Sequence, residues 1–352
     1  MQRFDIRSLP LPIVQAPLAG GPSTVALAAG VIRAGGLGFL AAGYRAADAV
    51  QADIRELRAE VDGPFGVNLF VPSERPAEPA TYAGYVDDMR TEAQRYGVPL
   101  GVPRADDDAW EAKLDVVCAE QVPLVSFTFG CPAPAVVDRI HASGAAVWVT
   151  VTDAAEAHQG QAIGADALVV QGAEAGGHRA SFRDDGDAGA IGLLSLLQLV
   201  GAEVKLPLVA TGGIATGAAV AAVLSCGAAA AQLGTALMRT PEAGTAAVHR
   251  RALASPAATR LTRAFTGRTA RSIVNRFVDE HASAPSAYPE VHHLTAPLRA
   301  AGREREDPDV VNLWAGEAHA LSRDLPVEEL VRRLAHEARA ALAAAALRLP
   351  GQ

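Results

Sequence analysis

Eight short apolar runs recur along the first 235 residues, and glycine or polar residues follow most of them. Stretches with helical character separate the runs. The runs lie at residues 13–16, 37–41, 65–70, 124–128, 146–150, 167–171, 208–211 and 229–233, and the helical stretches include 24–34, 46–61, 82–96, 133–142, 153–163, 192–200 and 216–225. Strands that are apolar on both faces belong in a parallel sheet covered by helices. Eight such units predict an α/β fold, a (β/α)8 TIM barrel.

Two segments depart from this alternation. Residues 71–108 contain several prolines and charges, and we expect them to extend the third βα connection. Residues 239–309 are richer in charge and predict a small, mainly helical second domain over the barrel mouth. The barrel then comprises residues 1–238, with the C-terminal helices of residues 310–352 packing back on it. A long helix is expected at residues 327–347.

Charge and cysteine content narrow the class of protein. The formal net charge is −8 and Lys and Arg are not clustered, so no nucleic-acid partner is expected. No apolar run approaches the length needed to cross a bilayer, so we expect no membrane partner and a cytoplasmic location. Cys118, Cys131 and Cys226 are too widely spaced for a disulfide framework or a metal site. We therefore expect no metal site. The protein is expected to be a monomer or a homodimer.

Glycines follow two consecutive predicted strands near the end of the barrel. Gly212 and Gly213 follow the seventh strand, and Gly234 and Thr235 follow the eighth. In (β/α)8 barrels these two loops commonly bind a phosphate through backbone N–H groups and the N-terminus of a helix. The pattern predicts a phosphorylated ligand and leaves FMN, a nucleotide and a sugar phosphate open.

A glycine-rich loop at residues 171–178 follows the sixth strand and ends in His178. Its small residues allow close approach to a planar ligand, and an imidazole there can remove a proton or bind an anion. We expect Glu174 to cap the loop. Asn68 and Gln171 offer neutral amides at strand ends, which suit a flavin pyrimidine ring, although a buried amide needs a partner in any case.

Several blocks of sequence, in order along the chain, resemble class I nitronate monooxygenases, formerly called 2-nitropropane dioxygenases. The blocks are PIVQAPLAGG (12–21), AGGLG (34–38), PFGVNLF (64–70), VSFTFG (125–130), GAEAGGH (172–178), FTGRTAR (265–271) and LWAG (313–316). The first block is shared with related flavin barrels. The VSFTFG and GAEAGGH blocks point more narrowly to class I.

This resemblance implies FMN as cofactor and the oxidation of alkyl nitronates, such as propionate 3-nitronate, by O2. The products would be a carbonyl compound and nitrite, formed via a flavin semiquinone. His178 falls where the family carries its catalytic histidine, as a base or as a contact to the nitronate. Tyr288 is implied as a substrate contact, in a segment that follows the family pattern only loosely. The implied FMN contacts are Ala16, Pro17, Asn68, Gln171, Gly176, Gly177, Gly212, Gly213, Gln232, Leu233, Gly234 and Thr235.

Three other functions remain open. An FMN-dependent enoyl-(acyl carrier protein) reductase using NAD(P)H shares the N-terminal block, the histidine loop and the Gly-Gly turn. Residues 127–130 and 265–271 favour the monooxygenase instead. A barrel dehydrogenase of the nucleotide type would need Cys131 as nucleophile, but Pro132 follows it in place of the loop such enzymes use. A non-catalytic flavin-binding role is the remaining class.

Overall fold

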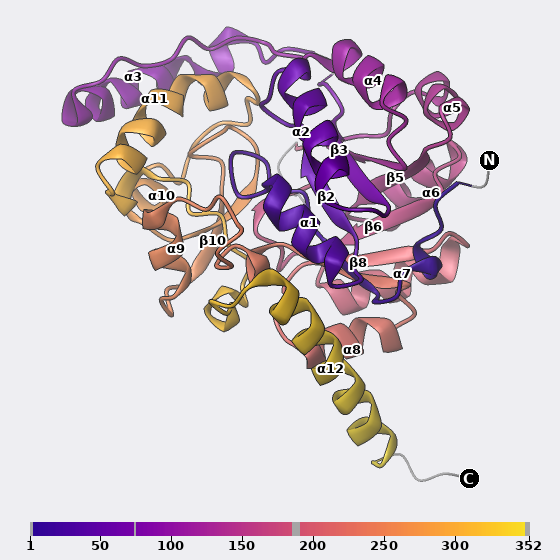
Figure 1. Ribbon diagram of the computed structural model, residues 1–352. Coiled ribbons are helices and arrows are strands. Elements are labelled where there is room, and N and C mark those ends of the chain that lie inside the picture. The colour runs from indigo at the N-terminus through magenta and orange to yellow at the C-terminus, as the bar shows by residue number, and fades with distance from the viewer. Residues whose placement is uncertain (1–2, 74, 185–190, 349–352) are drawn as a thin grey trace.

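The computed structural model describes residues 3–73, 75–184 and 191–348, and a barrel of eight parallel strands forms its centre (Figure 1). The strands are β1 (Ile13–Gln15), β2 (Gly38–Ala41), β3 (Phe65–Phe70), β4 (Leu124–Thr128), β5 (Ala146–Val151), β6 (Ala167–Gln171), β8 (Leu208–Thr211) and β9 (Ala230–Leu233). Their order is β1-β9-β8-β6-β5-β4-β3-β2, and a parallel bridge between Val14 and Leu37 joins the two ends. The predicted barrel is confirmed.

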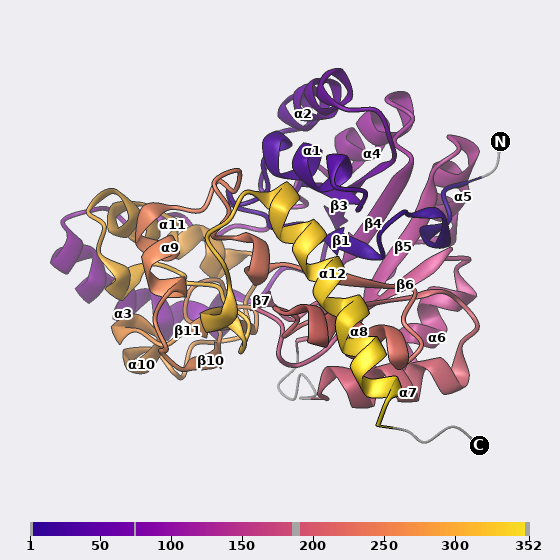
Figure 2. The same cartoon turned by 60° about the horizontal axis from the view of Figure 1, so that its bottom comes forward.

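Helices cover the outside of the barrel and follow the strands in sequence. They are α1 (Val25–Arg33), α2 (Ala47–Glu60), α4 (Trp110–Ala119), α5 (Pro134–Ala142), α6 (Ala154–Ala162), α7 (Leu193–Glu203), α8 (Gly217–Ser225) and α12 (Val327–Ala346). The side chains of Thr24, Asp153 and Thr216 accept a hydrogen bond from the N–H three residues on, which fixes where α1, α6 and α8 begin. The last helix, α12, lies along α8 and α1 (Figure 2). No helix of the described chain is long and apolar enough to cross a membrane.

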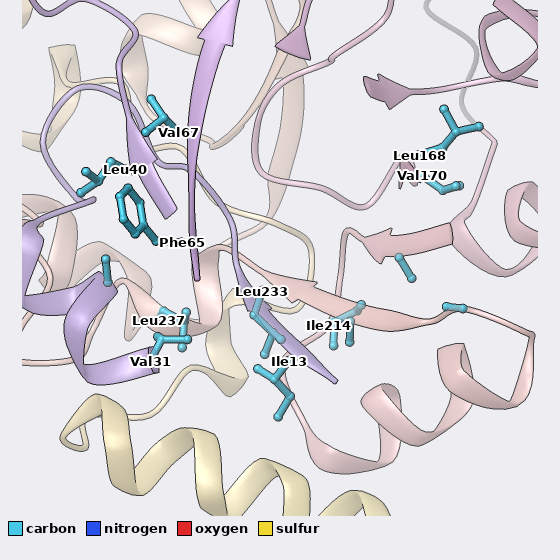
Figure 3. Close-up of a cluster of buried hydrophobic side chains, with 14 of the residues drawn as sticks. Ile13, Val31, Leu40, Phe65, Val67, Leu168, Val170, Ile214, Leu233 and Leu237 are labelled. Carbon is cyan, nitrogen blue, oxygen red and sulfur yellow. The ribbon is translucent and has the colours of Figure 1, made fainter. Parts of the chain in front are cut away.

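Side chains of alternate strand residues enter two separate apolar layers, as the two-residue period of a strand requires. Outward-facing residues such as Ile13 and Leu233 pack against the helices (Figure 3). Inward-facing residues such as Val14 and Trp148 fill the barrel, where Ile6 of the short helix η1 (Ile6–Ser8) joins them. This packing fills the interior of the barrel with its own apolar core.

A second group of elements, here called the accessory module, lies beside the barrel (Figures 1 and 2). It consists of α3 (Pro79–Tyr96), α9 (Ala247–Leu253), β10 (Thr259–Thr262), β11 (Ala270–Ile273), α10 (Arg276–Glu280) and α11 (Glu290–Glu304). Tyr85 and Met89 of α3 share an apolar core with Phe265, Phe277 and Leu298. The predicted second domain, residues 239–309, leaves out α3 and contains two strands as well as helices; its bounds stay a prediction.

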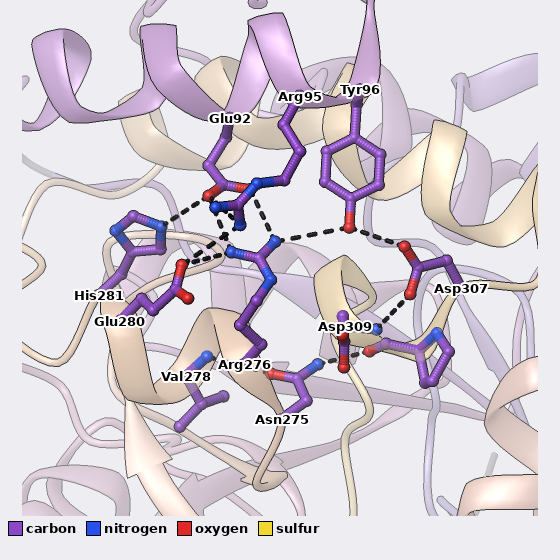
Figure 4. A network of polar contacts seen from close by, with 11 residues as sticks. Glu92, Arg95, Tyr96, Asn275, Arg276, Val278, Glu280, His281, Asp307 and Asp309 are labelled. Atoms are coloured by element: carbon purple, nitrogen blue, oxygen red, sulfur yellow. Dashed lines mark hydrogen bonds and ion pairs between the residues drawn. The ribbon is translucent and has the colours of Figure 1, made fainter.

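An ion network ties α3 to α10 inside the accessory module (Figure 4). Glu92 of α3 accepts hydrogen bonds from both terminal nitrogens of Arg276, at 2.9 and 2.8 Å. The Tyr96 hydroxyl donates to Asp307 at 2.8 Å. The side chains of Glu92 and Arg276 are only 3% and 20% exposed, so their ion pair is largely shielded from water and joins two segments far apart in the chain.

A small antiparallel sheet connects the accessory module to the barrel. β7 (Gly177–His178) pairs with β11, with His178 opposite Ala270, and β11 pairs in turn with β10. The glycine-rich loop after β6 is therefore held in place as an edge strand. The alternation of apolar residues did not predict these short strands.

Candidate active site

A cavity of about 480 Å³ opens at the carboxyl ends of the barrel strands, under the accessory module. The alternation along each strand determines which side chains reach it. The inward-facing positions low in the barrel are apolar, whereas those at the carboxyl ends are polar. These polar residues are Asn68, Thr128, Thr150, Gln171, Thr211 and Gln232. The barrel therefore has an apolar base and a hydrogen-bonding floor to the cavity.

The loops after β8 and β9 form a glycine cradle on one side of this cavity. Gly212 and Gly213 have φ of 118° and 67°, a conformation that favours glycine over residues with a side chain. Gly234 and Thr235 face them, and the Thr235 hydroxyl accepts a hydrogen bond from the Gly316 N–H at 3.0 Å. The N-terminus of α8, at Gly217, follows the first pair after three residues. Backbone donors and a helix N-terminus in this arrangement suit a phosphate.

Two of the floor amides have unused hydrogen-bonding capacity. Gln232 is 5% exposed, and its Oε1 has no hydrogen-bond partner among the described residues. Asn68 donates from Nδ2 to the hydroxyls of Ser126 and Thr128, at 2.9 and 3.0 Å, which leaves Oδ1 as its remaining acceptor. A buried acceptor without a partner costs free energy, so the floor favours a ligand that carries N–H donors.

Gln171, by contrast, is used by the protein itself. Its Oε1 accepts from the Ala180 N–H at 2.9 Å and from Arg179 at 3.0 Å, and its Nε2 donates to the His178 carbonyl at 3.1 Å. These bonds hold the loop that carries His178. The sequence left open whether this amide binds a ligand or only satisfies protein groups. Its contacts in the structure are all with protein groups.

Glu174 lies in the same loop and does not contact His178. Its carboxylate accepts from the Leu193 N–H at 3.1 and 3.0 Å, at the beginning of α7. Glu174 was expected to cap its own loop, but its carboxylate instead caps the N-terminus of α7.

His178 lies between the barrel floor and the accessory module. Its Nε2 is 2.9 Å from the hydroxyl of Thr266, which is 1% exposed. Aromatic rings surround the imidazole, with centroid distances between 5.3 and 5.8 Å. The rings belong to Phe129, Tyr288 and Trp314.

The electrostatic surroundings keep His178 neutral. Burial lowers the pKa of His178 to about 3, the positive charges of Arg268 and Arg299 add to this effect, and Asp184 opposes it. At neutral pH the imidazole therefore carries one proton and can donate one hydrogen bond and accept another. Uptake of a second proton is unfavourable unless an anion lies beside the ring.

Most residues predicted for the site line this one cavity. The lining set includes Ala16, Pro17, Asn68, Gln171, Gly176, Gly177, His178, Gly212, Gly213, Gln232, Gly234 and Thr235. Leu233 and Tyr288 are the exceptions, and the side chain of Leu233 points outward into the core between strands and helices (Figure 3). Tyr288 stands behind the lining, next to His178, and its hydroxyl donates to the Tyr44 hydroxyl at 3.0 Å.

Sequence reasoning missed several residues at the cavity. Thr128 and Thr150 could have been found from strand alternation, because they occupy the same inward row as Asn68. Thr266 and Arg299 gave no such signal, since both reach the cavity only through the packing of the accessory module.

The other candidate chemistries find little support in the geometry. Burial raises the pKa of the Cys131 thiol to about 11, so this cysteine is not an activated nucleophile. Glu92, Glu280 and His281 are the one group of described side chains close enough together to hold a metal ion. Arg276 binds both carboxylates of this group (Figure 4).

Comparison with known proteins gives consistent results over most of the chain. Residues 5–337 match the family model described as nitronate monooxygenase. A nitronate monooxygenase from Pseudomonas aeruginosa is 40% identical over 339 residues, covering 93% of this chain and 96% of that protein. The crystal structure of a nitroalkane oxidase from Streptomyces ansochromogenes is similar at a TM-score of 0.94 with 50% identity, covering 97% and 99% of the two chains. FabK from Thermotoga maritima matches at a TM-score of 0.77 with 24% identity, covering 98% of each chain, which shows a shared fold.

Proposed function

The chain belongs to the nitronate monooxygenase family, and we propose that with FMN bound it oxidises alkyl nitronates by O2 to a carbonyl compound and nitrite. Membership makes it an oxidoreductase acting on nitro compounds. The observation that carries the finer proposal is the single cavity in which the glycine cradle, the floor amides and neutral His178 meet.

The residues present fit FMN. The cradle of Gly212, Gly213, Gly234 and Thr235 would hold the phosphate through backbone N–H groups. The unpartnered Oε1 of Gln232 would accept a hydrogen bond from an N–H of the ring system. When bound, FMN supplies the electron acceptor for the nitronate and passes electrons on to O2.

His178 would then serve as a polar contact to the nitronate. A neutral imidazole can donate a hydrogen bond to an anionic oxygen, and the nearby arginine charges favour an anion at this place. A base toward neutral nitroalkanes must hold an extra proton, which burial and these same charges disfavour. We therefore propose that the enzyme acts on preformed nitronates much faster than on neutral nitroalkanes.

The decisive experiment combines cofactor identification with two anaerobic reductions. Flavin released from the purified protein should be FMN. Without oxygen, a nitronate should lower the flavin absorbance within the time of one catalytic turnover, whereas NADPH should leave it unchanged. Nitrite should then appear once air is admitted to the nitronate sample. Rapid bleaching by NADPH alone would instead favour the enoyl reductase.

Substitution of His178 tests its role. His178→Ala should retain FMN and lower kcat/KM for nitronates by about 100-fold, within the range for loss of a polar catalytic contact. His158→Ala, which removes an exposed histidine paired with Glu203, is the matched control and should change nothing. Full activity of His178→Ala on nitronates would show that the assigned role is wrong.

A further inference from the structure

Tyr44 combines a strained backbone with a place in the cavity wall. It follows β2, its φ is 64°, and it is 36% exposed as part of the cavity lining. A left-handed backbone is costly for an aromatic residue and persists only where the surrounding contacts enforce it, as they often do at functional sites. The contacts that hold Tyr44 therefore indicate what its side chain does.

Two charged residues hold this backbone in place. Asp108 accepts a hydrogen bond from the Tyr44 N–H at 2.9 Å. The same carboxylate lies 2.7 Å from the Nζ of Lys113, which is 1% exposed. A lysine is almost never buried so fully unless it is paired, because removing its charge from water is costly. This buried ion pair fixes the loop after β2, and Tyr44 with it.

Aromatic contacts fix the direction of the Tyr44 ring. The ring stacks on that of His292 of α11, with centroids 4.3 Å apart and planes at 6°, and it meets the ring of Phe70 at 5.4 Å and 70°. His292 and Phe70 also line the cavity. Tyr44 thus forms part of the cavity wall at the place where the barrel meets the accessory module.

The hydroxyl of Tyr44 has a proton that the protein does not use. Tyr288 donates to this hydroxyl at 3.0 Å, and the Tyr44 proton has no acceptor among the described residues. Burial raises the pKa of Tyr44 to about 12, so the hydroxyl keeps its proton at neutral pH. A hydroxyl that already accepts one hydrogen bond is polarised into a stronger donor. The Tyr44 hydroxyl therefore suits a ligand that carries an acceptor.

Tyr288 also relates this donor to His178. The ring of Tyr288 lies 5.8 Å from the imidazole of His178, centroid to centroid, while its hydroxyl donates to that of Tyr44. Tyr44 and His178 both line the cavity, whereas Tyr288 does not. The two polar groups thus pack against the same phenol and border neighbouring parts of the cavity.

We propose that the Tyr44 hydroxyl donates a hydrogen bond to an oxygen of the bound nitronate, and that Tyr288 positions this hydroxyl. The inference rests on the function proposed above, and it gives to Tyr44 the substrate contact that the sequence implied for Tyr288. A nitronate carries its negative charge on two oxygens, so one can accept from His178 and the other from Tyr44. Hydrogen bonds to a charged acceptor are stronger than those between neutral groups.

Removal of single hydroxyls from the FMN-loaded enzyme tests the contact. Tyr44→Phe keeps the ring on His292 and loses only the donor, so kcat/KM for the nitronate of nitroethane should fall about 10- to 100-fold with FMN retained. Tyr82→Phe is the matched control. Tyr82 lies on α3 and does not line the cavity, so the loss of its hydroxyl should leave kcat/KM unchanged.

A double-mutant cycle tests the positioning by Tyr288. Tyr288→Phe alone should lower kcat/KM about 3- to 10-fold, and it should have no further effect in a protein that already carries Tyr44→Phe. The same loss in both backgrounds would overturn the positioning role. A larger loss from Tyr288→Phe than from Tyr44→Phe would overturn the contact as well, since Tyr288 would then bind the substrate itself.

A binding measurement separates this proposal from the function on which it rests. Nitrate is a planar anion with N–O acceptors like those of a nitronate. Titrated into the FMN-loaded enzyme, it should perturb the flavin absorbance, and Tyr44→Phe should weaken its dissociation constant about 10-fold or more. If no nitronate were oxidised but Tyr44→Phe still weakened nitrate binding, the proposed function would fail and the anion contact would stand.

Three results would overturn the contact. The first is an affinity for nitrate that is absent or that Tyr44→Phe leaves unchanged. The second is full kcat/KM of Tyr44→Phe on a nitronate that the native enzyme oxidises. The third is loss of FMN from Tyr44→Phe, since the hydroxyl would then serve the flavin.

Discussion

At the scale of single residues, the backbone of the glycine cradle is the feature most open to test. Gly213 has φ of 67°, and an added Cβ would lie 3.0 Å from Cβ of Glu174. Gly213→Ala should therefore weaken FMN binding about 10-fold or more, because the cradle must shift to relieve a left-handed alanine and a tight contact. The dissociation constant from flavin fluorescence quenching measures this.

The control for that change is Gly227→Ala. Gly227 has a similar left-handed φ of 92° between α8 and β9, but an added Cβ there meets nothing within 4 Å. Gly227→Ala therefore places an alanine in a left-handed backbone conformation, as Gly213→Ala does, but at a position outside the cradle. If both variants bound FMN equally well, the cradle would not be the phosphate site.

His249 provides a residue-scale prediction about pH. It is 6% exposed, and burial lowers its pKa to about 4, against an effect of its hydrogen bond to the Trp314 carbonyl that raises it. Between about pH 6.5 and pH 4 the unfolded chain holds a proton here that the folded chain does not. Stability is therefore full above pH 6.5 and falls as the pH falls, by about 2 kcal/mol at pH 5 from this residue.

Denaturant unfolding at pH 7.5 and pH 5.0 measures that loss. His249→Gln keeps a side-chain N–H for the Trp314 carbonyl but cannot be protonated, so its stability should decline about 2 kcal/mol less than that of the native chain. An identical decline in both proteins would show that His249 is not the residue responsible.

At the scale of elements, the packing of α12 on the barrel depends on glycines. A Cβ at Gly217 of α8 would lie 2.3 Å from Cβ of Glu337 and 2.6 Å from the Ala338 nitrogen. Gly217→Ala should push α12 away and destabilise the protein by about 2 kcal/mol despite the better helix propensity of alanine. Thermal unfolding measures the change.

Gly201 of α7 is a helical glycine with room for a side chain. The nearest atom to an added Cβ there is Cδ1 of Leu208, at an ordinary 3.7 Å. Gly201→Ala should therefore stabilise the protein by up to about 1 kcal/mol. The two variants should thus change the free energy of unfolding in opposite directions. If Gly217→Ala stabilised the protein, α12 would not pack closely against α8.

At the scale of the whole molecule, the accessory module depends on a buried pair between distant segments. Glu92 and Arg276 are 184 residues apart in the chain and are joined by two hydrogen bonds (Figure 4). Glu92→Gln would leave the more exposed Glu280 as the carboxylate partner of Arg276 among the described residues, beside a long contact to the Tyr96 hydroxyl, and should destabilise the module by about 3 kcal/mol. Near-UV circular dichroism during thermal unfolding follows this module through its aromatic core.

An exposed ion pair on the same helix serves as the control. Asp87 and Arg90 are 2.7 Å apart, with side chains 67% and 69% exposed. Asp87→Asn should change stability by less than about 0.5 kcal/mol. Equal effects of the two substitutions would mean that burial does not decide the value of the Glu92–Arg276 pair.

The sequence by itself determined the barrel and much of the floor of the site. Strand and helix periods are local, so every barrel strand was predicted to within one residue of its observed bounds. Glycines such as Gly213, at a position that needs a left-handed backbone, are visible without a structure. Applied strictly, the alternation along β9 would also have shown that Gln232 faces inward and Leu233 outward.

Only the tertiary structure decided what lies above that floor. His178 meets Thr266 across 88 residues of chain, and its loop becomes a strand through pairing with β11. The apolar side of α3 predicts that it is covered, but not that Phe277 and Leu298 cover it. From the local sequence, Arg299 is expected to be an exposed charge on an amphipathic helix. Its burial, without a counterion among the described residues, follows from where α11 packs, because long-range packing, and not local period, determines which helix face closes a cavity.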